Sequence, residues 1–208
     1  MKNQNLLLTS LVACALGSPI LARAADVPVD LTYDVNTRER PVVAVRDTCP
    51  IHITPTQDAR QNKETLGATF RGPLLAGDAT PWIVDGLTHL KDFGFAVDKT
   101  ADASPPQEGL TVKTTLTRAY TWQIGFKLFS MVALKAEFID KNGVLQEKYY
   151  RAHGDKTNMW DADSEYVTTL NYGINNLLPV MADDLVQLCK GAKVAVFSYA
   201  GPDPAAKK

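Results

Sequence analysis

Apolar and polar positions alternate most regularly in the middle of the chain. Residues 110–117 (LTVKTTLT) alternate with a period of two, as a half-buried strand does. Residues 120–139 are rich in aromatic and branched side chains and predict a strand, a turn or bulge near Gly125, and a second strand. The Asn-Gly pair within residues 140–143 tolerates the positive φ of a hairpin turn, so residues 144–152 are predicted to return as the next strand.

A helix is predicted from Thr80 onwards. Thr80 is a favoured N-cap residue, and Pro81 suits the first helical position, where its missing N–H would have no partner. One face stays apolar over the following turns, and Gly94 offers the left-handed conformation that ends many helices. Residues 95–97 then open a further strand.

A second helix is predicted to begin at the acidic residues Asp161, Asp163 and Glu165. Negative charge is favoured at a helix N-terminus. This explains the carboxylates more simply than calcium binding, because the glycine and distal glutamate of a calcium loop are missing. Pro179 lies inside the helix and is expected to kink it near Asn175. The apolar face of this helix consists of Val167, Leu170, Ile174, Leu177, Met181, Leu185 and Leu188.

The other segments carry weaker patterns. Residues 41–46 (PVVAVR) predict a first strand, and residues 193–199 (KVAVFSY) predict a last one. Residues 54–78 are polar or glycine-rich and predict a long loop. Residues 25–38 predict an extended lead-in, and residues 201–208 a disordered tail.

The order of these elements predicts the fold class α+β. Residues 39–200 are expected to form one two-layer domain, a mostly antiparallel sheet with two main helices packed on one face. The net charge is −1, and the sequence has no strongly basic patch. Nucleic acid is therefore not an expected partner.

The N-terminal residues 1–24 have the pattern of a secretory signal peptide. Lys2 supplies a positive charge, residues 6–16 form an apolar run, and Ala22 and Ala24 have the spacing that signal peptidase recognises. The run is shorter than the roughly 20 residues that span a bilayer. Cleavage after Ala24 predicts a periplasmic protein.

The cysteines add an alternative and a prediction. Residues 11–14 also fit the lipobox of bacterial lipoproteins, so lipidation of Cys14, with an anchor in the outer membrane, stays open as the alternative. Cys49 and Cys189 remain as an even pair in a chain bound for an oxidising compartment, and they predict a disulfide. The alternative for this pair is two unpaired buried thiols.

Candidate catalytic residues are few. His52 has no second ligand at metal spacing, and His89 lies beside an apolar helix face, where a structural role is the simpler interpretation. His153 is followed by Asp155 and Lys156 in a predicted loop, a combination suited to acid–base chemistry. No serine-hydrolase, P-loop, dinucleotide or zinc-protease motif occurs. We therefore expect no catalytic residue, no metal and no cofactor, with a small periplasmic hydrolase using His153 and nearby carboxylates as the alternative.

An aromatic cluster in the predicted strand pair is the candidate partner surface. If one face of the pair stays uncovered, the cluster forms an apolar patch of the kind that contacts partners or membranes. Otherwise these side chains build the core beneath the helices. The cluster consists of Tyr120, Trp122, Phe126 and Phe129.

The chain resembles the YajG-like group of envelope lipoproteins in five features that follow one another in the sequence. That group is related in shape to the auxiliary lipoproteins of ABC-type transporters. They are the strand PVVAVRD, the RGP loop, the helix and strand at residues 87–97, the tyrosine-rich strand ending at residues 149–152, and the late helix with Asn175-Asn176-Leu177-Leu178. The resemblance covers about residues 39–190. It implies a non-enzymatic envelope protein and supplies no catalytic residues. The cysteine pair and the Ala-x-Ala cleavage site depart from that group's pattern.

The expected function follows from these points. The chain is predicted to be an exported, non-catalytic accessory or interaction protein of the bacterial cell envelope. Its expected partner is another envelope protein or component, and membrane contact is expected only if Cys14 is lipidated.

Overall fold

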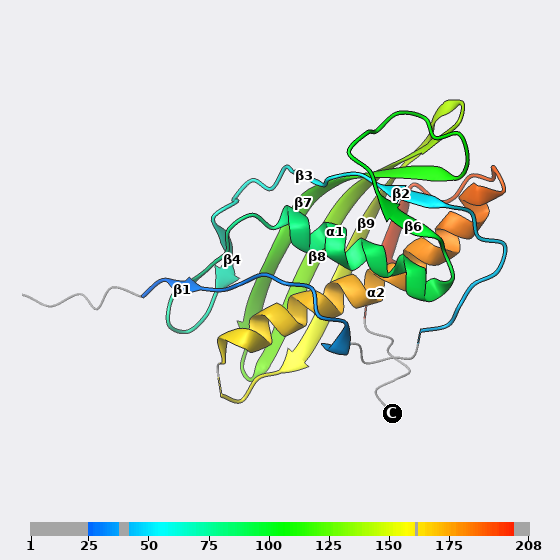
Figure 1. The fold of residues 1–208 in the computed structure, drawn as a ribbon. Helices are drawn as coiled ribbons and strands as arrows, with labels where there is room; N and C mark the ends of the chain where they lie inside the picture. The colour runs from blue at the N-terminus through cyan, green and yellow to red at the C-terminus, as the bar shows by residue number, and fades with distance from the viewer. Residues whose placement is uncertain (1–24, 38–41, 161, 202–208) are drawn as a thin grey trace, which may run out of the picture.

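A long antiparallel meander forms the centre of the molecule (Figure 1). The structure is a computed structural model that describes residues 25–37, 42–160 and 162–201. The meander consists of β7 (Leu110–Ile124), β8 (Lys127–Asp140) and β9 (Gly143–Thr157). Gly125 and Gly143 have φ values of 58° and 115° at the two turns, a conformation that favours glycine. The predicted strands and turns of this region are therefore confirmed.

Short strands extend the meander on both sides and make the sheet mixed. β2, β3 and β4 each pair in parallel with β7, and β10 pairs in parallel with β9. The prediction of a mostly antiparallel sheet thus holds for the meander but not for its edges. The short strands are β1 (Val27–Pro28), β2 (Ile51–Ile53), β3 (Gln57–Asp58), β4 (Thr65–Ala68), β5 (Pro73–Leu75), β6 (Val97–Lys99) and β10 (Phe197–Ala200).

The prediction of a first strand at residues 41–46 is wrong for the part that the structure describes. Residues 42–46 form no strand, and Val43 is 73% exposed. The backbone N–H of Val45 donates one hydrogen bond to the carbonyl of Phe93 (2.9 Å). A single bond of this kind does not form the repeated pairing of a β-strand. The predicted loop at residues 54–78 instead contributes β3, β4 and β5, whose sequences are too short to show a period of two.

The first helix begins and ends much as predicted. α1 (Thr80–Thr88) continues as the 3₁₀ helix η2 (His89–Phe93), and Gly94 follows in the left-handed region. Thr80 is the first helical residue and not the N-cap. The carboxylate of Asp78 accepts hydrogen bonds from the backbone N–H and the hydroxyl of Thr80, at 2.9 and 2.8 Å. Asp78 thus supplies the side-chain oxygen that accepts a hydrogen bond at the start of the helix, a role that the sequence pattern predicted for Thr80.

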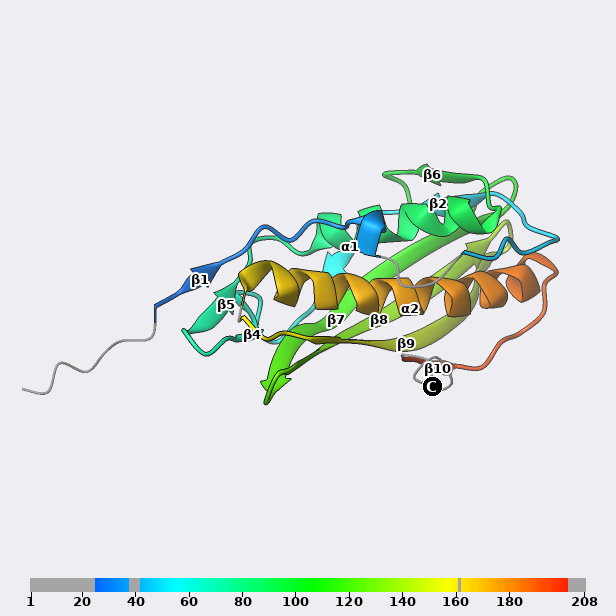
Figure 2. The ribbon, with the colours of Figure 1, turned by 90° about the horizontal axis from the view of Figure 1, so that it is seen from below.

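The second helix, α2 (Asp163–Cys189), packs across the meander and continues as one helix through Pro179. It approaches β9 closely at Gly154, where a Cβ atom would lie 2.2 Å from the carbonyl oxygen of Thr169. The hydroxyl of Ser130 also donates to that oxygen (2.6 Å). α1 and α2 lie on the same side of the meander (Figure 2), so one face of the sheet is covered by helices, as predicted.

A disulfide and two hydrogen bonds connect the N-terminal part of the described chain to α2. Cys49 and Cys189 form a disulfide with a Cα–Cα distance of 5.8 Å, which joins the segment before β2 to the end of α2. The hydroxyl of Tyr33 donates to Asn175 of α2 (2.5 Å), and Asn171 donates to the carbonyl of Thr32 (3.2 Å). The extended lead-in is therefore packed on α2.

No helix in the described part of the chain is long and apolar enough to cross a membrane. The predicted signal peptide and Cys14 lie outside the described residues, as does the tail from residue 202.

Candidate functional site

The face of the meander opposite α2 gathers most of the aromatic residues singled out from the sequence. Side chains alternate between the two faces of a strand. Tyr150 contacts Asp184 of α2, so His153 and Asp155 point to the opposite face. The strand register places Phe129 beside Asp155 and Trp122 beside Phe129. These aromatic residues therefore share the face that α2 leaves uncovered.

Five rings form a continuous row across this face, from β7 to β10. Trp122 and Phe129 are stacked with their ring centres 5.4 Å apart, and Tyr120 lies 5.2 Å from Trp122. His153 meets Trp122 edge-on at 6.1 Å and contacts Tyr199 at 5.2 Å. Such tilted and offset contacts are favourable arrangements of aromatic rings. We call this row, Tyr120, Trp122, Phe129, His153 and Tyr199, the aromatic face.

The structure divides the predicted cluster into two parts. Tyr120, Trp122 and Phe129 are half-buried in the aromatic face. Phe126 lies in the turn between β7 and β8 and is 68% exposed. Tyr199 was not a predicted site residue, because only its pairing with β9 brings it beside His153. Its presence in the apolar run at residues 193–199 was the one available signal.

Charged residues surround the aromatic face and are mostly paired. Lys113 contacts Glu137 (3.1 Å), Lys135 contacts Glu147 (2.7 Å), and Lys127 contacts Asp155. The remaining charges are two exposed arginines on either side of Ala133, and neither forms an ion pair with another described residue. The aromatic face therefore has an excess of positive charge beside it, at Arg118 and Arg151.

His153 lies within β9 and not in the predicted loop, because β9 continues to Thr157. Partial burial among the rings lowers the pKa of His153, and the positive charge of Arg151 lowers it further. The carboxylate of Asp155 is paired with Lys127. The imidazole thus lies among aromatic side chains as part of a surface.

The titration of His153 tests this environment. We expect its imidazole to titrate below the ordinary value of 6.5, because burial and Arg151 both oppose the charged form. Arg151→Gln should raise the midpoint, since it removes the repulsive charge and leaves the burial unchanged. The imidazole proton resonances in a pH series measure both midpoints. An Arg151→Gln midpoint equal to or below that of the parent protein contradicts this account.

The other predicted polar residues make local contacts. His52 contacts Asp98 (2.7 Å) and the backbone carbonyl of Glu108 (3.1 Å), and His89 contacts Asp92 (2.9 Å). Within the residues that the structure describes, no group of three or more histidine, cysteine or acidic side chains has a metal-binding arrangement.

The acidic residues at the start of α2 contact basic side chains from other elements. Asp163 pairs with Arg71, and Glu165 pairs with Lys156 at 2.5 Å. Both carboxylates lie in the first turn of the helix, as the sequence predicted. Asp161 lies outside the described residues.

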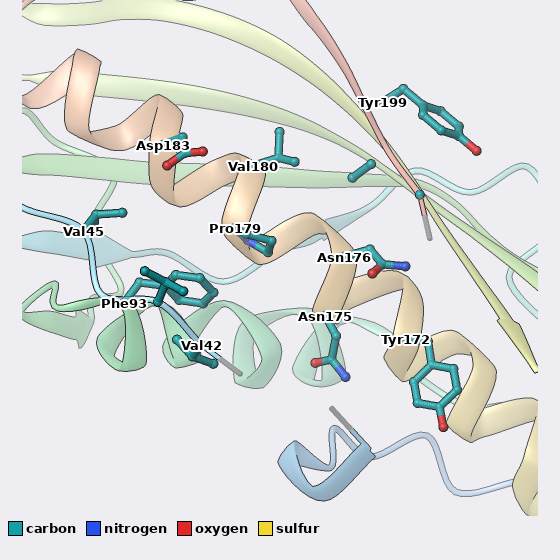
Figure 3. Close-up of a pocket in the computed structure, with 13 residues that line it drawn as sticks. Val42, Val45, Phe93, Tyr172, Asn175, Asn176, Pro179, Val180, Asp183 and Tyr199 are labelled. Carbon is teal, nitrogen blue, oxygen red and sulfur yellow. The ribbon is translucent and has the colours of Figure 1, made fainter. Parts of the chain in front are cut away.

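A cavity of about 420 Å³ lies along the outer side of α2. Figure 3 shows Asn176 and Pro179 on the helix, Val42 and Phe93 on one side, and Tyr199 on the other with its ring pointing away from α2. The volume is in the range of small-molecule sites. Val42 and Gly201 line this cavity, and each adjoins residues outside the described part of the chain. We therefore assign it no ligand.

Comparison with known proteins gives distant similarities. No protein-family model matches the sequence, and no curated protein matches it. Similar solved structures include a Xanthomonas campestris protein of the DUF330 family, with 8% identity and a TM-score of 0.48 over 76% of this chain and 92% of that one. Lipoprotein GNA1162 from Neisseria meningitidis has 14% identity and a TM-score of 0.35 over 69% of this chain and 99% of that one.

A minor lipoprotein from Acinetobacter baumannii has 7% identity and a TM-score of 0.38 over 71% of this chain and 95% of that one. Lipoproteins are thus among the similar structures. With TM-scores below 0.5, they carry no conclusion about the function of this chain.

Proposed function

We propose that this chain is an exported, non-catalytic accessory protein of the bacterial cell envelope. It binds another envelope protein through the aromatic face. Residues 1–24 act as the export signal, with cleavage after Ala24 in the periplasm, and lipidation of Cys14 is the competing route to the same compartment. The disulfide between Cys49 and Cys189 supports an oxidising compartment.

The observation that carries this proposal is the aromatic face on the side of the sheet opposite α2. Tryptophan, tyrosine and arginine are the residues most enriched where protein interfaces concentrate their binding energy. This face combines Trp122, Tyr120 and Tyr199 with the two arginines beside Ala133. The paired lysines and carboxylates around it have the composition of a polar interface rim.

The excess positive charge favours a partner with an acidic side chain. In antiparallel and mixed sheets, neighbouring strands are about 4.8 Å apart, so Arg118 on β7 and Arg151 on β9 flank β8 at roughly twice that spacing. An acidic group placed over Ala133 lies within reach of both guanidinium groups. Guanidinium groups recognise carboxylates through paired hydrogen bonds.

Photo-crosslinking in cells tests the proposal. A photoreactive phenylalanine analogue at Tyr199, which is 59% exposed on the aromatic face, is expected to crosslink to one discrete envelope protein. The same analogue at Val43, which is 73% exposed beside η2 and α2, is the matched control and should not. Adding Arg118→Glu and Arg151→Glu should reduce the Tyr199 crosslink at least tenfold, because charge reversal repels an acidic partner.

The outcome also separates the two candidate functions. Equal crosslinking from Tyr199 and Val43, or no effect of the charge reversals, contradicts the proposed surface. The hydrolase alternative makes a different prediction. His153→Ala with Asp155→Ala would abolish the activity of the protein in cells, while a folded Trp122→Glu variant would retain it.

A further inference from the structure

Three chain connections meet at one end of the molecule, away from the centre of the aromatic face. They are the turn between β4 and β5, the turn between β7 and β8, and the connection from β9 to α2, and Figures 1 and 2 show all three at the same end of the sheet. Each connection, together with the last residue of β7, presents large apolar side chains to solvent. These are Phe70 (74% exposed), Ile124 (66%), Phe126 (68%), Met159 (65%) and Trp160 (89%). We call them the apolar end.

Contacts between the connections hold the apolar end together. The backbone N–H of Asn158 donates to the carbonyl of Phe126 (2.7 Å), which joins two of the three connections. Gly67 of β4 pairs with Thr121 of β7, so the β4–β5 turn follows β7 towards the same end. Arg71 in that turn also contacts Asp163 at the start of α2. The exposed side chains thus lie on chain segments that are joined at one end of the sheet.

Three basic side chains that the structure describes near the apolar end are paired with carboxylates. Arg71 contacts Asp163, Lys127 contacts Asp155, and Lys156 contacts Glu165. Each of these basic side chains therefore has a carboxylate partner. The surface offers apolar side chains without a large excess of either charge, unlike the aromatic face with its two arginines.

The N-terminal segment joins the domain at this same end. A Cβ atom on Gly72, in the β4–β5 turn, would lie 2.0 Å from the carbonyl oxygen of Ala25. β1 then continues from this point by pairing with β5. Any residues that remain before Ala25 in the mature protein, including a lipid-bearing Cys14, therefore leave the domain beside the apolar end.

We infer that the apolar end inserts into the interfacial region of a lipid bilayer. Tryptophan and other aromatic side chains are favoured at the boundary between headgroups and acyl chains. Exposed apolar clusters of this kind mark interaction sites. In the lipidated form, which is the competing route under the proposed function, the chain before Ala25 anchors a bilayer on this side of the domain. This favours a bilayer over a protein partner as the occupant. The aromatic face stays free to bind its own partner.

Vesicle binding tests the inference. The protein carries Cys14→Ser in every sample, which excludes an acyl anchor, and is purified after export by cells. We expect it to float with vesicles of phosphatidylcholine, and with vesicles of phosphatidylethanolamine and phosphatidylglycerol, with partition coefficients within about threefold. Because insertion is apolar, raising the salt from 50 to 500 mM should change binding by less than about twofold. Tryptophan emission should shift to shorter wavelength, with Trp160 as the most exposed tryptophan.

Matched variants identify the surface that binds. Phe126→Ser with Trp160→Ser should lower the partition coefficient at least tenfold, because two large side chains lose their contact with the acyl region. Val43→Ser with Phe197→Ser removes two exposed apolar side chains elsewhere (73% and 54% exposed) and should leave binding unchanged.

Four results overturn the inference. They are no binding to either vesicle, binding that requires phosphatidylglycerol, full binding by the Phe126/Trp160 variant, and equal loss in both double variants. Sedimentation of the same samples adds a further test. If the apolar end pairs two copies of the chain in place of a bilayer, the protein dimerises without binding vesicles, and only the Phe126/Trp160 variant is monomeric.

Discussion

Replacing Cys49 and Cys189 with serine is expected to lower the free energy of unfolding by about 5 kcal/mol. The two cysteines are separated by 140 residues, so the disulfide closes a loop over most of the described chain. In the chain-entropy account, a long closed loop restricts the unfolded ensemble strongly, and the loss grows with the logarithm of loop length. Domains of this size have a total stability of roughly 5–15 kcal/mol. The disulfide therefore contributes a large share of the stability.

Urea unfolding of the parent protein and of the double serine variant, both without reductant, measures this difference. Reductant should destabilise the parent protein to about the same extent as the double serine substitution, and it should have no further effect on the variant. A difference below about 1 kcal/mol contradicts the prediction, because it is much smaller than the entropy expected for a loop of this length.

Replacing Lys148 with methionine is expected to cost about 3–5 kcal/mol. The side chain of Lys148 is 1% exposed, and its ammonium lies 2.8 Å from the carboxylate of Asp184 on α2. The hydroxyl of Tyr150 donates to the same carboxylate oxygen (2.9 Å). Burial and the neighbouring carboxylate both raise the pKa of Tyr150, so its hydroxyl stays protonated and continues to donate. Methionine at position 148 leaves the Asp184 carboxylate without its counter-charge between β9 and α2.

An exposed ion pair on the opposite face of the same sheet provides the control. Lys135 contacts Glu147 at 2.7 Å, and its side chain is 26% exposed. Lys135→Met should cost no more than about 1 kcal/mol, since pairs near water contribute little. Lys148→Met combined with Asp184→Leu should recover much of the loss, because no buried charge is then left alone. If Lys148→Met is no more destabilising than Lys135→Met, the buried pair does not have this role.

The meander, the two helices and the disulfide pair were predictable from the order of residues along the chain. These features depend on local patterns. A period of two over 110–117 fits strand β7, and glycine fits the positive φ at Gly125 and Gly143. Two cysteines in a chain with the sequence pattern of a signal peptide favour pairing with each other. Long elements repeat their pattern often enough to be recognised in the residues alone.

The edges of the sheet could not be predicted from local patterns. β2, β3 and β4 contain two to four residues each and are strands because β7 lies beside them. Residues 42–46 look more strand-like in sequence, but they have no neighbouring strand with which to form a ladder. A strand exists through its hydrogen-bonded partner, and that partner is set by the fold.

The same reason applies to the candidate sites. Tyr120, Trp122 and Phe129 were identifiable as aromatic residues, but the sequence left open whether they formed core or surface. The answer depended on which face α2 covers and on the pairing of β10, which brings Tyr199 to His153. The apolar end likewise exists because three connections, distant in sequence, meet at one end of the sheet. Residue types are encoded locally, whereas their exposure and neighbours depend on contacts between distant segments of the chain.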